Sequence, residues 1–420
     1  MKKSLSCGSL HHSIFAAPDV LRHCCKRFYV NGEMKGDVEI CKVTSKEDIS
    51  YEKIKEEKKK LYDNINSGKV TECTGCPWLT EEEWPDLDQM EIKRISVEHH
   101  SVCNLRCSYC SDTYFGGKQA SYDIKLLMDG LSDKNAISEN VSVVWGGGEP
   151  VLLKSFDSTF PYIIDRYKPT HNHVFTNATT YNNILGEYLR KGQVTITTSV
   201  DAGTAEMYKK IKGQDKLIAV LENLVKYRED GGDSVTIKYI LMPENSIQKE
   251  LIAFIEEVKK HGLADCSFQI SSDYTDENIP DIVFEAAMFL FKGLKNIGAK
   301  MINFDYHLRP RIDKYQEEER YGLEEMRNGY DNVIVWGAGE YATRMLENKF
   351  FSGQISFFVD SDPGKQGKKL NGVLVKSPDA IREEKEALIF IASIEFYRDI
   401  YKEILNMGIS ADQVLDANAF

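Results

Sequence analysis

The sequence predicts an α/β protein in which a partial (β/α)6 barrel lies between a small cysteine-rich region and a second, smaller α/β domain. Three observations predict this arrangement. Six β-rich runs alternate with helix-like segments between Arg94 and Ala299, nine of the ten cysteines lie within the first 110 residues, and a glycine-rich turn begins at Gly337. A chain of 420 residues is long enough for two or three compact units. We place the units at residues 1–90, 91–310, 311–330 and 331–420.

The composition predicts a folded protein without a nucleic-acid partner and without a membrane span. Hydrophobic residues make up 42% of the chain, and its net charge of −12 repels phosphate backbones. Its longest apolar stretches, such as residues 387–392, fall far short of the roughly 20 residues that span a bilayer. The first six residues lack the apolar core of a secretory signal. We therefore expect a cytoplasmic location, where clustered cysteines indicate metal binding rather than disulfides.

The predicted barrel is based on the rhythm of apolar segments. The β-rich runs are residues 95–99, 141–145, 173–176, 194–200, 235–241 and 267–271. Between the fourth and fifth runs, apolar residues recur at helical spacing in residues 217–225. Strands that alternate with helices in this way are expected to be parallel, with right-handed crossovers. In such a barrel the ligand-binding groups collect at the carboxyl ends of the strands.

Three cysteines follow the first run. Cys103, Cys107 and Cys110 are separated by three and then two residues, and no fourth cysteine is close by. Three thiolates at this spacing can hold three corners of a cubane iron-sulfur cluster and leave its fourth iron open to a small molecule. A structural zinc site is the alternative, but structural zinc prefers four protein ligands.

The spacing Cys103-x3-Cys107-x2-Cys110, with the aromatic Tyr109 before the last cysteine, resembles the signature of radical S-adenosylmethionine (SAM) enzymes. The resemblance implies a TIM-like partial barrel and a [4Fe-4S] cluster whose open iron binds the methionine moiety of SAM. It also implies Tyr109 as a cofactor-binding residue and a reducing electron donor such as flavodoxin or ferredoxin. The implied reaction is reductive cleavage of SAM to a 5′-deoxyadenosyl radical that takes hydrogen from a substrate carbon.

The second run ends in the segment Gly146-Gly147-Gly148-Glu149-Pro150. Consecutive glycines let the backbone approach a ligand closely, and the carboxylate can accept a hydrogen bond from an ammonium group. The segment resembles the Gly-Gly-Glu-Pro motif of the same family, which implies that Gly147, Gly148 and Glu149 contact the methionine end of SAM. An ordinary turn between a strand and a helix is the alternative interpretation.

Two further positions lie at the ends of predicted strands. Asn177 follows the third run, and Ser199 lies near the end of the fourth, two residues before Asp201. The family resemblance implies that Asn177 and Ser199 contact the ribose and carboxylate of SAM, with Asp201 as a further candidate. Short polar residues at these places also form ordinary turns.

A second set of cysteines precedes the barrel. This part of the chain contains an early cysteine, a cysteine pair before a glycine-containing hairpin, a helix and a closing Cys-x2-Cys. In this order it resembles the SPASM or twitch region, which holds auxiliary clusters in many radical SAM enzymes and usually follows the barrel. The resemblance implies a second [4Fe-4S] cluster on Cys7, Cys24, Cys73 and Cys76, with Cys25 or Cys41 as substitutes. A zinc site closed by four cysteines is the alternative. We expect Cys266 to be a buried core residue.

The last part of the chain predicts a Rossmann-like domain after a charged, solvated helix at residues 311–330. Gly337-x-Gly339-x-x-Ala342 follows an apolar run, and Asp360 lies about twenty residues later. This pattern fits the phosphate-binding turn and ribose partner of the Rossmann fold. It is similar to modules attached to bacterial sugar-modifying enzymes. Two interpretations of this domain stay open: it binds a nucleotide or nucleotide-sugar, or it is a docking domain whose turn is empty.

These expectations define three hypotheses for the function. The Rossmann-like domain favours a sugar or nucleotide-linked sugar that undergoes epimerisation, dehydration or dehydrogenation. The SPASM-like cysteines favour a ribosomally synthesised peptide as the substrate. A non-catalytic redox sensor or zinc-stapled scaffold is the alternative from another class, and it predicts zinc, or iron without cleavage of SAM.

Overall fold

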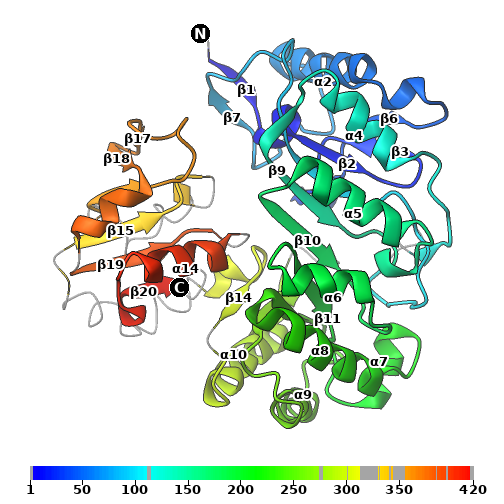
Figure 1. Cartoon of the computed structure of the whole chain (residues 1–420), viewed down its shortest axis with the longest axis vertical. Coiled ribbons are helices and arrows are strands. Elements are labelled where there is room, and N and C mark those ends of the chain that lie inside the picture. The colour runs from blue at the N-terminus through cyan, green and yellow to red at the C-terminus, as the bar shows by residue number, and fades with distance from the viewer. Residues whose placement is uncertain are drawn as a thin grey trace. The chain divides into compact units, whose positions relative to one another are not determined.

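The computed structural model describes residues 3–110, 115–273, 278–299, 301–312, 330, 332–339, 342–343, 355–384, 386–393 and 396–416 (Figure 1). The helix predicted at residues 311–330 falls almost entirely outside this part of the chain. The chain divides into two compact units. The first comprises Met1–Ile240, Ile247–Ser267 and Asp273–Asn278, and the second comprises Leu241–Ser246, Phe268–Ser272 and Ile279–Phe420.

The first unit contains parallel strands that neighbour one another in chain order. They are β8 (Ile92–Val97), β9 (Ile137–Trp145), β10 (His171–Phe175), β11 (Thr195–Ser199) and β12 (Val235–Leu241). Each pairs in parallel with the next. Together with β13 (Ser267–Ser272) they correspond to the six runs predicted from the sequence. The predicted class, an α/β protein with a large parallel sheet, is confirmed.

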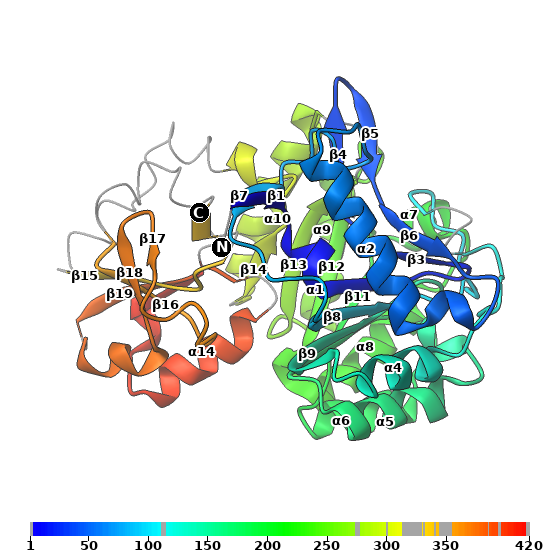
Figure 2. The ribbon, with the colours of Figure 1, turned by 90° about the horizontal axis from the view of Figure 1, so that it is seen from above.

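Helices connect these strands on the outer face of the sheet (Figures 1 and 2). They are α4 (Ile124–Ser132), α5 (Phe156–Tyr167), α6 (Asn183–Arg190), α7 (Ala205–Lys212), α8 (Leu217–Gly231) and α9 (Gln248–Lys260). Burial alternates along β12, and its buried Tyr239 packs against Phe254 of α9 with ring centroids 4.9 Å apart. One set of alternate side chains therefore faces the helices, and the other set faces the opposite side of the sheet.

The cysteine-rich region adds strands to this sheet. Its elements are β1 (Ser4–Ser6), α1 (Gly8–His12), β2 (Ser13–Ala16), β3 (Val20–Arg22), β4 (Arg27–Val30), β5 (Glu33–Gly36), β6 (Glu39–Lys42), α2 (Tyr51–Asn66) and β7 (Thr80–Glu82). β2 pairs in parallel with β8, and β3 and β6 continue the sheet antiparallel. β4 and β5 form the predicted hairpin, whose turn residues Asn31 and Gly32 have φ values of 53° and 80°. Positive φ at both central residues is typical of a two-residue hairpin turn.

The second unit contains the parallel strands β13 and β14 (Ile302–Phe304), α10 (Asp281–Asn296) and a separate six-stranded sheet. The strands of that sheet are β15 (Asn332–Trp336), β16 (Phe357–Val359), β17 (Lys369–Leu370), β18 (Val373–Lys376), β19 (Ala387–Ile391) and β20 (Val414–Asp416), with α14 at Tyr397–Asn406. Their order is β17-β18-β16-β15-β19-β20. The parallel strands, numbered along the chain, thus follow the order 3-2-1-4-5, as in the Rossmann fold.

The described part of the chain contains no helix that is both long enough and apolar enough to span a membrane.

Candidate active site

The predicted cluster-binding cysteines lie in a loop that follows β8. Two backbone hydrogen bonds attach this loop to the end of α7: Arg106 N–H donates to Lys212 O at 3.0 Å, and Ser108 N–H donates to Ile211 O at 2.8 Å. Cys103, Cys107 and Cys110 are all half-buried. The loop conformation is therefore fixed by its neighbours as well as by its own sequence.

The surroundings of two of these thiols oppose ionisation. Burial raises the pKa of the Cys103 thiol, and the Leu105 N–H that donates to its sulfur at 3.5 Å partly offsets this effect. Burial also raises the pKa of Cys107, and the nearby ammonium group of Lys212 lowers it. Because metals bind the thiolate form, iron binding would release protons at this loop.

The glycine segment runs alongside residues 98–102, which connect β8 to the thiol loop. Gly148 N–H donates to His100 O at 3.0 Å, and Glu149 N–H donates to Val102 O at 2.7 Å. A Cβ atom at Gly148 would lie 2.2 Å from Val102 O, and one at Gly147, whose φ is +90°, would lie 2.7 Å from His100 O. The two backbones approach too closely for any side chain at these positions.

Glu149 is a buried carboxylate with two partners from the end of β10. Its side chain accepts hydrogen bonds from the Thr176 hydroxyl at 2.7 Å and from Asn177 N–H at 2.5 Å, and the residue is only 2% exposed. Burial raises the pKa of Glu149 to about 7, although both hydrogen bonds favour the charged form. The structure thus brings together Glu149 and Asn177, which are 28 positions apart in the chain.

Asn177 also connects this carboxylate to the thiol loop. Its side-chain amide lies 3.8 Å from the sulfur of Cys103 and donates to Asn104 Oδ1 at 2.8 Å. Asn104 in turn donates to the Thr179 hydroxyl at 2.8 Å. The ends of β8, β9 and β10 therefore meet in one hydrogen-bonded group. Ser199 lies at the end of the next strand, β11, and is half-buried.

Tyr109 and Asp201 meet at a buried ion pair. The Tyr109 hydroxyl donates to Asp201 Oδ2 at 2.7 Å and accepts from Lys212 Nζ at 2.6 Å. Lys212 and Asp201 form an ion pair in which their side chains are 2% and 0% exposed. Asp201, with a φ of +62°, also accepts Ile240 N–H at 2.6 Å. The triad of Tyr109, Asp201 and Lys212 therefore helps to stabilise the conformation of the thiol loop.

Sequence reasoning did not identify Lys212. It follows Lys209 and Lys210 in a helix, and such a run of lysines is typical of a solvated helix face. The signal available was the following Gly213, which ends α7 with a φ of 79° and packs its Cα against Arg106 of the thiol loop.

The four N-terminal thiols expected from the resemblance lie around one apolar core. Cys73 belongs to this core with Leu10, Leu61 and Ile65, and Cys7, Cys24 and Cys76 pack against it. Burial, together with neighbouring thiols of the set, raises the pKa of Cys73 to about 12 and that of Cys76 to about 11. The structure therefore brings together Cys7, Cys24, Cys73 and Cys76.

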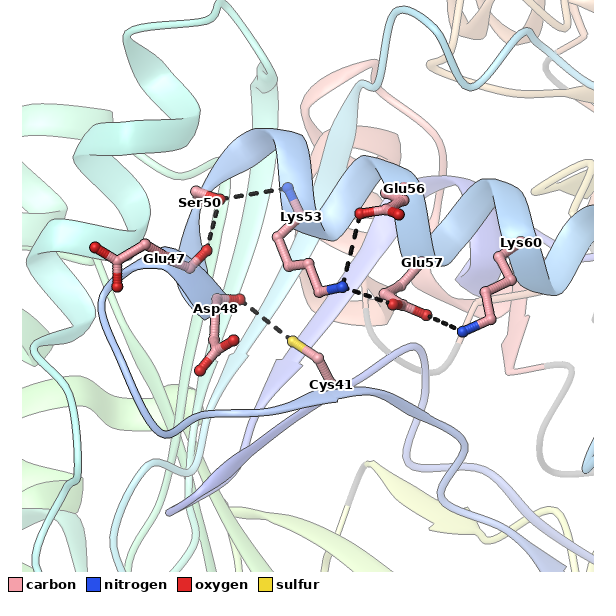
Figure 3. A network of polar contacts seen from close by, with 8 residues as sticks. All are labelled: Cys41, Glu47, Asp48, Ser50, Lys53, Glu56, Glu57 and Lys60. Carbon is pink, nitrogen blue, oxygen red and sulfur yellow. Dashed lines mark hydrogen bonds and ion pairs between the residues drawn. The ribbon is translucent and has the colours of Figure 1, made fainter.

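The alternative cysteines lie elsewhere. The thiol of Cys41 donates to Asp48 O at 3.3 Å, in the turn that precedes α2 (Figure 3). The charged groups that act most strongly on the Cys25 thiol are Glu98, which follows β8, and Arg94, which lies within it. Cys266 is 1% exposed, as expected for a core residue. Of the cysteine pair, Cys24 is therefore the better candidate for the four-thiol set.

The donor chemistry of both thiol sets fits an iron-sulfur cluster, because cysteine thiolates hold the irons of such clusters. Four cysteine thiolates are also a donor set of structural zinc, so the zinc alternative for the N-terminal set stays open. Among the described residues, no group of three or more His, Cys, Asp or Glu side chains is already arranged to hold one metal ion.

The predicted phosphate turn of the C-terminal sheet forms around Asp360. Gly337 has a φ of +111°, and Ala338 N–H donates to Asp360 Oδ2 at 2.8 Å. The ammonium group of Lys365 contacts the same oxygen at 2.9 Å, and Asp362 N–H donates to the other at 2.9 Å. The carboxylate expected to bind a ribose thus organises the turn itself. Residues 340–341 and 344–354 lie outside the described part of the chain.

Comparison with known proteins identifies two parts of the chain. Residues 97–258 match the family model of the radical SAM superfamily, and residues 329–415 match a model described as C2185-like, N-terminal. The GTP 3′,8-cyclase of Vibrio atlanticus is 28% identical over 173 residues, which cover 40% of this chain and 50% of that protein. The probable GTP 3′,8-cyclase of Metallosphaera sedula is 28% identical over 178 residues, covering 40% and 53%. The chain spans about half the length of these curated relatives.

Among solved structures, SuiB of Streptococcus suis matches with a TM-score of 0.42 and 14% identity, covering 64% of this chain and 57% of that chain. The enzyme anSMEcpe with bound AdoMet matches with a TM-score of 0.40 and 15% identity, covering 50% and 63%. The family match contains the thiol loop, the glycine segment, Asn177 and the Tyr109–Asp201–Lys212 triad. Residues 97–258 therefore form a domain of the radical SAM superfamily.

Proposed function

We propose that this chain cleaves SAM reductively and uses the 5′-deoxyadenosyl radical to take a hydrogen atom from a substrate carbon. The observation that carries this proposal is the hydrogen-bonded group in which Asn177 contacts both Glu149 and Cys103. It joins the thiol loop to the segment that resembles the SAM-binding motif. When bound, the [4Fe-4S] cluster supplies the electron that breaks the C5′–S bond and releases methionine.

The residues of the chain hold and orient the reactants. Cys103, Cys107 and Cys110 would bind three irons and leave the fourth to SAM, with Gly147 and Gly148 keeping the adjoining backbone close. A carboxylate offers about four acceptor positions. Thr176, Asn177 and the backbone of Val151 use three of those of Glu149, so the remaining position can accept from the ammonium group of SAM. That positive charge would favour the ionised form of the carboxylate.

For the substrate, we propose a sugar or nucleotide-linked sugar that undergoes epimerisation, dehydration or dehydrogenation, and the nucleotide-linked form is the one we favour. Two features support this choice. The curated relatives carry the name GTP 3′,8-cyclase, which denotes a nucleotide substrate, and they align with about 40% of this chain. The C-terminal sheet has the Rossmann strand order with a glycine turn after β15.

A peptide is the second candidate substrate. The observation that favours it is the N-terminal set of Cys7, Cys24, Cys73 and Cys76, which resembles the auxiliary-cluster region of peptide-modifying radical SAM enzymes. We propose that this set binds a second [4Fe-4S] cluster, and that a flavodoxin or ferredoxin supplies electrons. We also propose that the turn at Gly337 binds a nucleotide.

The cleavage reaction has a direct test. The full chain is reconstituted anaerobically with iron and sulfide, mixed with dithionite and SAM, and assayed for 5′-deoxyadenosine. We expect the wild type to form this nucleoside and the Cys107→Ala variant to lose at least about 99% of the activity, because three thiolates are needed to hold the cluster. The absence of 5′-deoxyadenosine, while a control radical SAM enzyme turns over in the same buffer, would contradict the proposal and favour the scaffold hypothesis.

The substrate class is tested by the response of this cleavage to added compounds. Nucleoside triphosphates, nucleotide-linked sugars and short peptides are added separately at equal concentration. A substrate should raise the rate of 5′-deoxyadenosine formation and give a product of altered mass. Stimulation confined to peptides would reject the nucleotide hypothesis and support the peptide alternative.

A further inference from the structure

Helix α2 carries a lysine in its buried apolar stripe. The buried residues of this helix are Ile54, Lys58, Leu61 and Ile65, a spacing that places all four on one face. Lys58 is 0% exposed. A fully buried lysine is rare unless an anion compensates its charge.

The other face of α2 shows how its exposed lysines are compensated. Lys53 and Lys60 both reach Glu57, with N–O distances of 2.8 Å and 3.1 Å, and Lys53 also approaches Glu56 at 3.6 Å (Figure 3). These pairs lie along two turns of the helix, and the side chains of Glu56 and Lys60 are exposed to solvent.

Lys58 instead points into the N-terminal core. Its ammonium group donates to Leu10 O at 2.7 Å and to Ser13 O at 2.8 Å, at the end of α1. Two carbonyl oxygens satisfy two of its three donors but carry no net charge. Burial lowers the pKa of Lys58 to about 7, and the charged groups that act in the opposite direction are the thiols of Cys7 and Cys24.

The backbone of Leu10 connects this ammonium group to the four-thiol set. Leu10 N–H donates to the sulfur of Cys7 at 3.4 Å, while Leu10 O accepts from Lys58. Leu61, one turn further along α2, belongs to the core cluster that contains Cys73. Lys58 is therefore connected to the four-thiol set in two ways: through the backbone of α1, and through the apolar residues of α2.

A metal-thiolate centre at these four cysteines would supply the missing negative charge. Four thiolates around a [4Fe-4S] core of charge about 2+ give a net charge of about −2, and one-electron reduction makes it more negative. In a poorly hydrated core such a charge is costly unless a cation lies nearby. The attraction between Lys58 and the cluster would offset the free-energy cost of removing each charge from water.

We propose that Lys58 is the buried counter-ion of an iron-sulfur centre held by Cys7, Cys24, Cys73 and Cys76. This inference rests on the second cluster of the proposed function. Lys58 acts as a positioning and charge-compensating residue and does not bind iron. Removing its charge destabilises the reduced centre more than the oxidised one, because the reduced centre carries the additional negative charge. The reduction potential should then become more negative, and less iron should be retained.

The test isolates the N-terminal centre in the full chain. Cys103, Cys107 and Cys110 are replaced together by alanine, so that the remaining bound iron and sulfide report on the N-terminal thiols. Into this background we introduce Lys58→Met, Lys58→Gln or, as the matched control on the exposed face of the same helix, Lys60→Met. Each protein is reconstituted anaerobically, its iron and sulfide are measured, and its reduction potential is followed by electron paramagnetic resonance.

We expect the background and the Lys60→Met variant to bind about four irons per chain with equal potentials. Lys58→Met should lose at least about half of this iron, as expected when a buried charge is left without its partner. Lys58→Gln keeps hydrogen-bond donors for Leu10 O and Ser13 O, so it separates loss of charge from loss of folding. Its potential should shift to more negative values while its circular dichroism spectrum stays unchanged.

Two results would overturn the inference, and they differ in what else they overturn. A background protein without iron and sulfide would reject the second cluster, and with it the counter-ion. A background protein with a full cluster, whose iron content and potential are unchanged in Lys58→Gln, would reject only the role of Lys58 and leave the second cluster in place.

Discussion

At the scale of single residues, Glu149 combines burial with a proposed role in SAM binding that depends on its charge. Burial raises its pKa from 4.5 to about 7. An acid whose pKa is higher in the folded state takes up protons on folding, so its contribution favours folding below pH 4.5 and is lost as the pH rises through about 7.

The Glu149→Gln variant should therefore show a weaker pH dependence of stability than the wild type. Between pH 5 and pH 8, cluster-free wild type should lose up to about 3 kcal/mol of unfolding free energy relative to the variant, since about 1.4 kcal/mol corresponds to one pKa unit. Urea unfolding at several pH values measures the difference. In the reconstituted protein the same change should weaken SAM binding at least about tenfold, because a hydrogen bond to a charged group is lost. Parallel pH profiles would contradict this assignment.

Asp201 and Lys212 also carry buried charges, and they form an ion pair. Removing one partner of this pair tests how much its charge contributes to stability. Asp201→Asn leaves Lys212 buried without an anion, which should cost about 3–5 kcal/mol of unfolding free energy. Asp201→Asn with Lys212→Met should recover most of this loss, because neither charge then remains. Urea unfolding measures both proteins, with Lys209→Met on the exposed side of α7 as the control. Equal losses in the single and double variants would indicate that the hydrogen bonds of Asp201, rather than its charge, carry the stability.

At the scale of elements, the sequence predicted those strands whose burial pattern matches their periodicity. β12 spans Val235–Leu241 as predicted, with alternating burial throughout. β9 begins at Ile137, four residues before the predicted start, because Ser138, Glu139 and Asn140 give no apolar signal. β2 was not predicted, since its four residues join the sheet through pairing with β8, which is a tertiary effect. The thiol loop and glycine segment were found by motif, whereas the support from Lys212 depends on contacts between distant segments.

The glycine segment between β9 and α5 leaves no room for a side chain at Gly147 or Gly148. A Cβ atom at Gly148 would clash with Val102 O, so Gly148→Ala should destabilise the protein by about 3 kcal/mol and abolish SAM cleavage. Gly130 is the matched control, because it lies within α4 and a Cβ atom there has nothing within 4 Å. Gly130→Ala should stabilise the protein by about 0.5–1 kcal/mol, with activity unchanged. Thermal unfolding and the 5′-deoxyadenosine assay check both, and a fully active Gly148→Ala variant would contradict the close backbone contact.

At the scale of the whole molecule, the barrel strands and the C-terminal sheet each have their own apolar core. The core of the C-terminal sheet includes Ile334, Trp336 and Ile389, all at most 1% exposed. The SAM-binding segments predicted here all belong to the first unit. Because the two parts have separate cores and the predicted SAM-binding residues lie in only one of them, we expect the two parts to unfold as separate cooperative steps.

Scanning calorimetry of the reconstituted protein should show two transitions, of which SAM raises only one. At a hundredfold excess over its dissociation constant, a ligand stabilises the state that binds it by about 2.7 kcal/mol. Ile389→Ala removes a buried side chain of β19 and should lower the other transition by about 2–5 kcal/mol, while SAM cleavage is retained. Gly148→Ala should do the reverse, lowering the SAM-sensitive transition alone. A single transition that moves as a whole in both variants would show that the two cores unfold together, and the C-terminal sheet would then be a required part of the catalytic unit rather than a domain added to it.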